Sequence, residues 1–168
     1  MSVVPIDVRD LVGHPGASRE VAVDGELEGL AGELVRVPER VHADLLLESV
    51  VEGILVSGRI RGTWTLRCAR CLTEFEGPFD VGVSELFVSE PDPEADDYLL
   101  DPEALIDPEQ LLRDAIGVEM PFSPLCREDC RGLCEVCGGN RNLDECPGHD
   151  AVDPRFAALS DLTFPDER

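Results

Sequence analysis

The sequence has no lysine and no long apolar segment. All fourteen basic residues of the 168-residue chain are arginines, which fits genomic base composition better than a mechanism. No apolar run approaches the roughly 20 residues that a membrane-spanning helix requires. The N-terminus also lacks the cationic segment and apolar run of a signal peptide. These absences predict a cytoplasmic protein with no membrane partner.

The motifs of common enzymes are absent as well. The three histidines, His14, His42 and His149, are scattered along the chain. There is no Gly-x-Ser-x-Gly sequence, no phosphate-binding loop and no His-Glu-x-x-His sequence. The sequence therefore predicts a protein that is not an enzyme and takes no small-molecule substrate.

Positive charge is scarce, and the net charge is −22. A polyanion is poorly suited to wrapping nucleic acid, because binding normally requires neutralisation of phosphates. This charge suits a basic partner, such as a ribosomal or other RNA-binding protein, although it also fits high solubility alone. The charge is uneven, since Gly53 to Thr73 contains four arginines and no acid, whereas Glu90 to Glu109 contains nine acids and no base.

The clearest secondary-structure signal is a strand over residues 59–68. Ile60, Trp64 and Leu66 occupy even positions, while arginine and threonine occupy odd positions. Period-two alternation places the three apolar side chains in a core and the arginines on a solvated face.

Two further strands flank this one. Residues 45–56 are rich in leucine, valine and isoleucine, and Ser57-Gly58 can form the turn that follows them. Residues 79–88 predict a third strand, in which Glu85 breaks the alternation and suggests a bulge or an edge position. Together the three predict an antiparallel β unit.

A helix is expected after an acidic loop over residues 89–106. Asp107 suits the N-cap, Pro108 the first helical position and Gln110 the third, and Pro121 limits the helix. The predicted apolar stripe consists of Leu111, Leu112, Ala115, Ile116 and Val118.

The fold class predicted is α+β. Its parts are an N-terminal extension packing on the β unit (1–43), the antiparallel β unit with acidic loop and helix (44–122), and a cysteine-rich zinc module (123–168). A short strand is expected around 34–37. Asp153-Pro154 can cap a short C-terminal helix that Phe156 and Leu159 dock.

Cysteine, by contrast, is abundant near the C-terminus, where five of the seven cysteines and a histidine follow one another closely. Such density indicates disulfides or a soft metal. A reduced compartment and an odd number of cysteines favour the metal, with zinc as the default structural ion. The site that we predict is Cys130, Cys134, Cys137 and Cys146, with Cys126 and His149 as alternates.

Two spaced pairs carry this prediction. In Cys134-Glu-Val-Cys137-Gly138, both thiolates can reach one tetrahedral ion, and glycine permits the turn that directs N–H groups at sulfur. Cys68 and Cys71 have the same spacing at the end of a predicted strand. They can join the C-terminal cysteines, supply half of a second site, act as a redox pair or have no role.

Arg59, Arg61, Arg67 and Arg70 form what we call the arginine strip. These residues can contact RNA phosphates or a partner, or they can pair with acids of the chain itself. The alternation of residues does not decide between these interpretations.

Several spaced motifs, in this order, resemble the YceD family, the large ribosomal RNA subunit accumulation proteins. They are Arg61-Gly-Thr-Trp64, Cys68-Ala-Arg-Cys71-Leu72 with Phe75, Leu111-Leu-Arg-Asp-Ala115, Pro124-Leu-Cys126, Cys130 through Asn142-Leu143, and Asp153-Pro-Arg155. The resemblance covers roughly residues 45–162. It implies a role in the synthesis, processing or stability of large-subunit (23S) ribosomal RNA, without a known catalytic activity.

The resulting hypothesis is a non-catalytic factor in ribosome biogenesis. Its acidic surface would engage a basic ribosomal protein or assembly factor of the pre-ribosomal large subunit, and its arginine strip would touch RNA. The alternatives are a thiol redox or metal-handling protein that uses Cys68 and Cys71, and a zinc-stabilised adaptor for another basic protein.

Overall fold

The computed structural model describes residues 3–27, 29–37, 40–90, 97–143, 146, 149, 155 and 159. The fold is mostly β-sheet with one helix, which confirms the α+β class. The elements are β1 (Ile6–Asp7), β2 (Ser18–Glu26), β3 (Val35–Arg36), β4 (Arg40–Ser49), β5 (Ile54–Arg67), β6 (Glu74–Val88), β7 (Tyr98–Leu99), β8 (Leu105–Ile106) and α1 (Pro108–Val118). Asp153, Pro154 and Phe156, expected in a C-terminal helix, lie outside the described residues.

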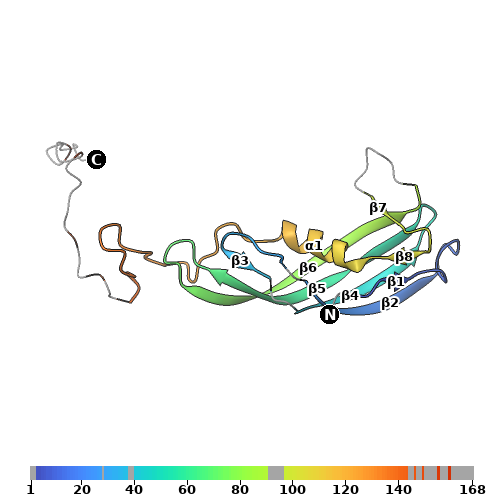
Figure 1. Cartoon of the computed structure of the whole chain (residues 1–168), viewed down its shortest axis with the longest axis horizontal. Helices are drawn as coiled ribbons and strands as arrows, with labels where there is room; N and C mark the ends of the chain where they lie inside the picture. Colours follow the sequence, from blue (N-terminus) through green and yellow to red (C-terminus); the bar gives the residue numbers. More distant parts are fainter. Residues whose placement is uncertain are drawn as a thin grey trace, which may run out of the picture.

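One long twisted sheet dominates the molecule, with α1 on one face (Figure 1). Its strand order is β2-β4-β5-β6-β7, with β3 paired to β5, and β1 and β8 form a separate antiparallel pair. The neighbours are antiparallel except β6 and β7. Among the described residues, no helix is long and apolar enough to cross a bilayer.

Strand β5 follows the predicted alternation. Ile60, Trp64 and Leu66 are buried, and Arg59, Arg61 and Arg67 are exposed. The ring of Phe79 on β6 lies opposite Gly62, and its centroid is 4.4 Å from that of Trp64. A side chain at position 62 would occupy the space that this ring fills. The absence of a side chain there therefore lets the two aromatic rings pack together in the core.

The prediction of a turn at Ser57-Gly58 is wrong, because both residues lie inside β5. The chain instead reverses between β4 and β5 at residues 50–53, where the N–H of Val50 donates to the carbonyl of Gly53 (2.9 Å). A residue other than glycine would not fit at position 58, since a Cβ there would lie 2.1 Å from the carbonyl oxygen of Asp44. The glycine allows close approach of β4 rather than a turn.

Strand β6 begins at Glu74, earlier than the predicted start at residue 79, and pairs with β5 without a break in register. Glu85 sits directly opposite Val56 in an unbroken register and is half-buried, so there is no bulge. On the other side of β6, β7 pairs only with Phe87 and Val88, so Glu85 has the expected edge position among the described strands. Its carboxylate lies at a cavity of about 210 Å³ that Tyr98 and Asp114 also line. The break in the apolar pattern thus falls beside this cavity, which apolar residues such as Val83 and Leu111 also line.

Helix α1 begins as predicted, with the Asp107 side chain accepting a hydrogen bond from the N–H of Glu109. Leu111, Leu112 and Ile116 are fully buried, which confirms most of the predicted stripe. Val118, the last residue of the helix, is 82% exposed, so the stripe does not extend to it.

The segment expected to be one loop over 89–106 contains two short strands. Tyr98–Leu99 extends the sheet as β7, and Leu105–Ile106 pairs with β1 as β8. Residues 91–96 lie outside the described residues. The described acids of this segment are therefore held on the folded body at the β7 end of the sheet (Figure 1).

Replacing Gly58 by alanine should destabilise the protein, because the new Cβ meets the backbone of β4. We expect a loss of about 1–3 kcal/mol in the free energy of unfolding, measured by urea denaturation. The matched control is Gly82→Ala on the neighbouring strand, where nothing lies within 4 Å of the added Cβ. Equal midpoints for the two variants would show that β4 does not approach position 58 closely.

Candidate metal centre

The loop that joins the two longest strands carries the first cysteine pair. Residues 68–73 follow the last β5–β6 pair, Arg67 with Glu74. The N–H of Cys68 donates to the carbonyl of Thr73 (2.9 Å), and the N–H of Leu72 donates to the carbonyl of Cys68 (2.9 Å). Leu72 adopts φ 59°, an uncommon value for leucine, which closes this tight loop.

Two cysteines from the segment after α1 meet this loop. The sulfur atoms of Cys68, Cys71, Cys126 and Cys130 all lie within 4.8 Å of one another. Two of the Sγ–Sγ distances, Cys68 to Cys130 and Cys71 to Cys126, are 3.7 Å. A zinc ion with bonds of about 2.3 Å to sulfur would place tetrahedral sulfur atoms about 3.8 Å apart. This group could hold a metal ion.

Burial sets this group apart from surface thiols. Cys68, Cys71 and Cys130 are buried, and Phe75 joins their small apolar cluster to the core of the sheet. The N–H of Ala69 donates to the carbonyl of Pro124 (2.8 Å), which fixes the incoming segment on the loop. The centre is therefore built where the C-terminal segment crosses the tip of the hairpin.

Burial and hydrogen bonds move the thiol pKa values in opposite directions. Burial raises the pKa of Cys68, but three backbone N–H groups outweigh it and lower this pKa to about 6. They belong to Cys126, Cys71 and Arg70. Burial, and then the neighbouring sulfurs, raise the pKa of Cys126 to about 12. The thiols resist ionising together because thiolates at this distance repel one another, and a bound cation would remove that repulsion.

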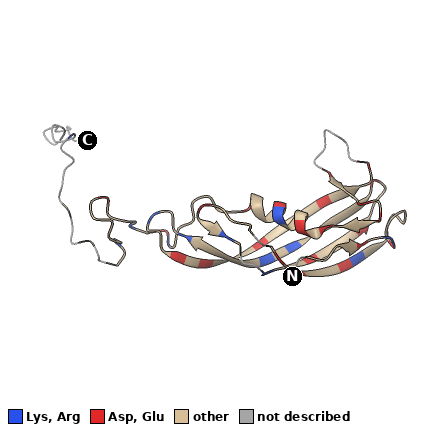
Figure 2. Ribbon diagram, viewed as in Figure 1, with Lys and Arg blue, Asp and Glu red and all other residues tan. Residues whose placement is uncertain are grey.

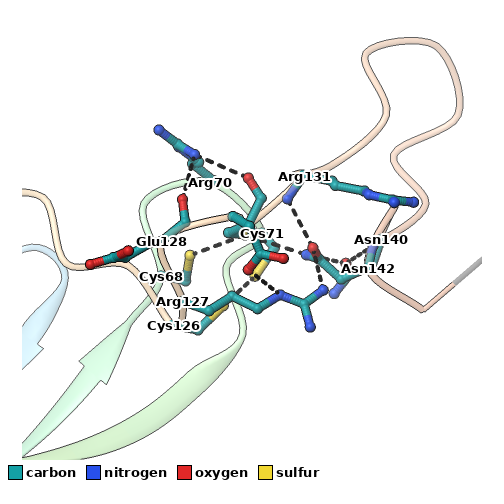
Figure 3. A network of polar contacts seen from close by, with 11 residues as sticks. Cys68, Arg70, Cys71, Cys126, Arg127, Glu128, Arg131, Asn140 and Asn142 are labelled. Atoms are coloured by element: carbon teal, nitrogen blue, oxygen red, sulfur yellow. Dashed lines mark hydrogen bonds and ion pairs between the residues drawn. The ribbon is translucent and has the colours of Figure 1, made fainter.

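A polar network surrounds the four sulfurs (Figure 3). The side-chain N–H of Asn142 donates to Cys130 Sγ (3.3 Å), and its Oδ1 accepts from Arg127 (2.7 Å) and from the N–H of Arg131 (2.8 Å). Asn140 donates to the Thr73 hydroxyl (3.3 Å), which is also in contact with Cys71 Sγ (3.3 Å). Such contacts orient sulfur ligands.

Sequence reasoning assigned no role to Asn140, Asn142 or Thr73 at this centre. The available signal was two asparagines within the cysteine-rich segment, where side-chain amides can donate to sulfur. Nothing in their spacing shows that they face the hairpin loop.

The remaining candidate ligands form a second group. One ligand atom from each of Cys134, Cys137, Cys146 and His149 lies within 4.8 Å of the others. This group could also hold a metal ion. The structure thus places Cys130 with the hairpin cysteines and Cys126, whereas the preferred ligand set had joined it to Cys134, Cys137 and Cys146. The alternates Cys126 and His149 fall in different groups.

Carboxylates surround the arginine strip. Arg59 pairs with Asp80 (2.7 Å), and Arg61 pairs with Asp44 (2.6 Å) and with Asp80 (3.5 Å). Arg67 pairs with Glu74 (3.2 Å). The acids come from β4 and β6, the two neighbours of β5, so basic and acidic positions lie side by side on the sheet (Figure 2).

Arg70 has a different environment from the other members of the strip. Its guanidinium donates to the carbonyl of Cys130 (3.1 Å) and, at 3.5 Å, to the carbonyl of Glu128. This residue therefore helps to hold the loop that supplies a sulfur of the first group, as Figure 3 shows.

His42 continues the charged network toward β2. Its ring nitrogens contact Asp24 (2.9 Å) and Asp44 (3.2 Å). These two hydrogen bonds, the one to Asp24 first, raise the pKa of His42 above its ordinary value of 6.5. The folded protein therefore binds this proton more tightly than the unfolded chain does.

The raised pKa of His42 gives the stability a defined pH dependence. The contribution of His42 is fully present below pH 6.5 and is lost as the pH rises through the raised pKa. Between about pH 5.5 and about pH 8.5, wild type should lose more unfolding free energy than His42→Gln. Chemical denaturation at both pH values measures the difference, and identical losses for the two proteins would refute the assignment.

Comparison with known proteins places this chain in a family. The profile described as large ribosomal RNA subunit accumulation protein YceD matches residues 56–163. An uncharacterized protein of Mycobacterium tuberculosis is 36% identical over 98% of this chain and 84% of its own length. An uncharacterized protein of Mycobacterium leprae is 35% identical over 99% and 80%, respectively. YlbN, an uncharacterized protein of Bacillus subtilis, is 30% identical over 84% of each chain.

No solved structure matches this chain significantly. The profile match covers β5, β6, α1 and all seven cysteines. It therefore includes both groups of candidate ligands and the hairpin that carries the first of them. The chain belongs to the YceD family, the large ribosomal RNA subunit accumulation proteins.

Proposed function

We propose that this protein is a non-catalytic factor that supports the accumulation of large-subunit ribosomal RNA by binding a basic protein of the pre-ribosomal particle. The observation that carries the proposal is membership of the YceD family, whose name states that role. The charge of the chain and the arrangement of its acids support the choice of partner.

A non-catalytic role agrees with the donor set at the first centre. Four cysteine sulfurs would occupy all four positions of a tetrahedral coordination sphere, whereas catalytic zinc keeps one position open for water or substrate. The thiol redox alternative needs an accessible thiolate, but Cys68, whose pKa is lowered to about 6, has no exposed surface. Burial thus favours a structural role for these thiols.

Zinc is the ion that fits the first group best. The site offers only sulfur, its Sγ–Sγ distances of 3.7 Å match a tetrahedral ion, and Asn142 donates to one of the sulfurs. Among the described residues 119–143 no helix or extended strand forms, so this segment has few backbone hydrogen bonds of its own. Metal binding would supply the free energy that orders it.

Replacing Cys71 by serine should remove one zinc ion per chain. Loss of a structural ion should lower Tm by roughly 10 °C, because several kcal/mol of folding free energy depend on the metal. Elemental analysis of the purified protein and thermal unfolding measure the two effects.

Leu72→Gly is the matched control for this experiment. It changes the neighbouring residue, keeps all four thiols and suits the φ of 59° at that position. It should retain the metal content of wild type. A Cys71→Ser protein with undiminished zinc would disprove the assignment, as would disulfides among these cysteines in protein purified without oxidation.

The partner surface that we propose is the acidic segment, Glu90 to Glu109. Its described residues, 90 and 97–109, lie toward the end of the sheet opposite the 68–73 loop (Figure 1). In the described part of this segment, Glu90, Asp97 and Glu103 form no ion pair with another described residue. Glu90 and Glu103 are exposed and Asp97 is half-buried. Acids that reach the surface without a cation beside them attract a basic protein and accelerate its association.

The ion pairs of the arginine strip favour the proposal of a protein partner over that of an RNA partner. Arg59, Arg61 and Arg67 would each have to leave a carboxylate of this chain before contacting a phosphate. The carboxylates would then remain near the RNA and repel it. RNA contact by these arginines is therefore not needed for the proposed role.

Removing the charges of Glu90, Asp97 and Glu103 should reduce large-subunit ribosomal RNA. In cells depleted of the protein, we expect the ratio of large- to small-subunit ribosomal RNA to fall and wild type to restore it. Glu90→Gln/Asp97→Asn/Glu103→Gln should restore it poorly, since affinity for a basic partner should fall by roughly tenfold. Gradient sedimentation should show less of this variant with pre-ribosomal particles.

The control for this experiment removes three other charges from the sheet, with Glu20→Gln/Glu48→Gln/Glu76→Gln. It should restore the ratio as wild type does. An unchanged ratio on depletion would overturn the biogenesis role and leave the adaptor for an unrelated basic protein. Equal failure of both triple variants would overturn the choice of surface.

A further inference from the structure

The loop that carries Cys134 and Cys137 repeats the hydrogen bonds of the hairpin loop that carries Cys68 and Cys71. In each loop, the N–H of the first cysteine donates to the carbonyl five residues later, at 2.9 Å in both. The N–H four residues after the first cysteine donates back to its carbonyl, at 2.9 Å in the hairpin loop and 2.8 Å in the second loop. The two loops, which are separate segments of the chain, thus share one pattern of backbone hydrogen bonds.

The flanking positions and the sharp turn correspond as well. Antiparallel pairs close both loops, Arg67 with Glu74 in the first and Leu133 with Asn140 in the second. The residue after the second cysteine has positive φ in both, 59° in the first and 72° at Gly138 in the second. In both loops, backbone N–H groups donate to the sulfur of the first cysteine. This geometry presents two thiolates to one ion.

We propose that Cys134, Cys137, Cys146 and His149 form a second zinc site, separate from the first and more readily exchanged. Cys146 and His149 bring their ligand atoms to within 4.8 Å of the loop sulfurs. Three thiolates and one imidazole complete a tetrahedral donor set that matches zinc. Cys130 is not available to this site, since its sulfur lies 3.7 Å from that of Cys68.

Exposure separates the two sites. Three of the four cysteines at the first site are buried, whereas Cys137 and His149 at the second are exposed and its other two ligands are half-buried. Water and chelators therefore reach the second site directly, while the first is shielded by the cluster around Phe75. Shielding by apolar groups slows the exchange of a bound metal.

The two sites are connected through the segment that follows the second loop. Asn140, which closes that loop, donates to Thr73 beside the first site, and Asn142 donates to Cys130 Sγ. The chain thus leaves the first site at Cys130, forms the second loop and returns to the first site. Loss of the second ion should therefore loosen the loop but leave the four sulfurs of the first site in place.

The test uses the full-length chain loaded with zinc. Native mass spectrometry should find two zinc ions in wild type and one in Cys137→Ser. Transfer of zinc to a chromogenic chelator should have a fast and a slow phase in wild type, and only the slow phase in Cys137→Ser. In the cobalt-substituted proteins, the absorption of a site with three sulfurs and one nitrogen should be absent from Cys137→Ser.

His149 variants provide the second arm and do not depend on the folding of Cys137→Ser. His149→Ala should speed the fast phase at least several-fold, and His149→Cys should retain two ions. A single zinc ion in wild type, or two ions in both Cys137→Ser and His149→Ala with unchanged release, would overturn the proposal. These readouts do not involve ribosomal RNA, so the proposal stands or falls independently of the proposed function.

Discussion

The meeting of four sulfur atoms from two distant segments is the constraint on which the C-terminal third of the described chain depends. Cys71 and Cys126 are separated by 55 positions, and Cys68 and Cys130 by 62. Closing loops of this length costs conformational entropy, and the apolar cluster around the sulfurs is small. Hydrogen bonds between the hairpin tip and residues 124–142 add support, but each contributes only about 1 kcal/mol. These four sulfurs could hold an ion, and an ion bound by all of them would contribute more than any of these hydrogen bonds to holding both segments.

The long β5–β6 hairpin provides the rigid base that this constraint requires. Its loop lies beyond the last strand pair, so the alternation that buries Ile60 and Trp64 also fixes the direction of the chain entering the loop. Phe75 is in contact with both the main core and the sulfur cluster. The geometry of the candidate metal centre therefore depends on the packing of the sheet. A shift of β6 against β5 would separate Cys68 from Cys71.

The sequence predicts those features that depend on a single segment. The β5 strand was predictable because burial of one face forces a period of two, and α1 because Asp107 and Pro108 form a local cap. Gly58 misled the prediction because a glycine serves either a turn or a close contact, and only the neighbouring strand decides. The ion pairs of Arg59 and Arg61 depend on strand register, which the sequence of β5 does not contain.

The ligand grouping shows the same limit. Spacing identified Cys68 with Cys71 and Cys134 with Cys137 as pairs, since two intervening residues let both thiolates reach one ion. Spacing could not assign Cys130, which is four positions from Cys134 in sequence but whose sulfur contacts the hairpin loop. Proximity in sequence favours grouping Cys130 with Cys134, whereas the path of the chain after α1 brings Cys130 to Cys68.

The acidic segment and the first group of candidate ligands lie toward opposite ends of the sheet, which bears on how the proposed partner would bind. The described residues of the acidic segment lie toward the β7 end, and the 68–73 loop lies at the other end of β5 and β6 (Figure 1). Screening at physiological ionic strength limits charge attraction to about 8 Å. Charge attraction from Glu90 and Glu103 therefore does not reach the two groups of candidate ligands. If these groups hold metal ions, exchange of the ions and binding of the proposed basic partner would be physically independent unless one partner spans the sheet.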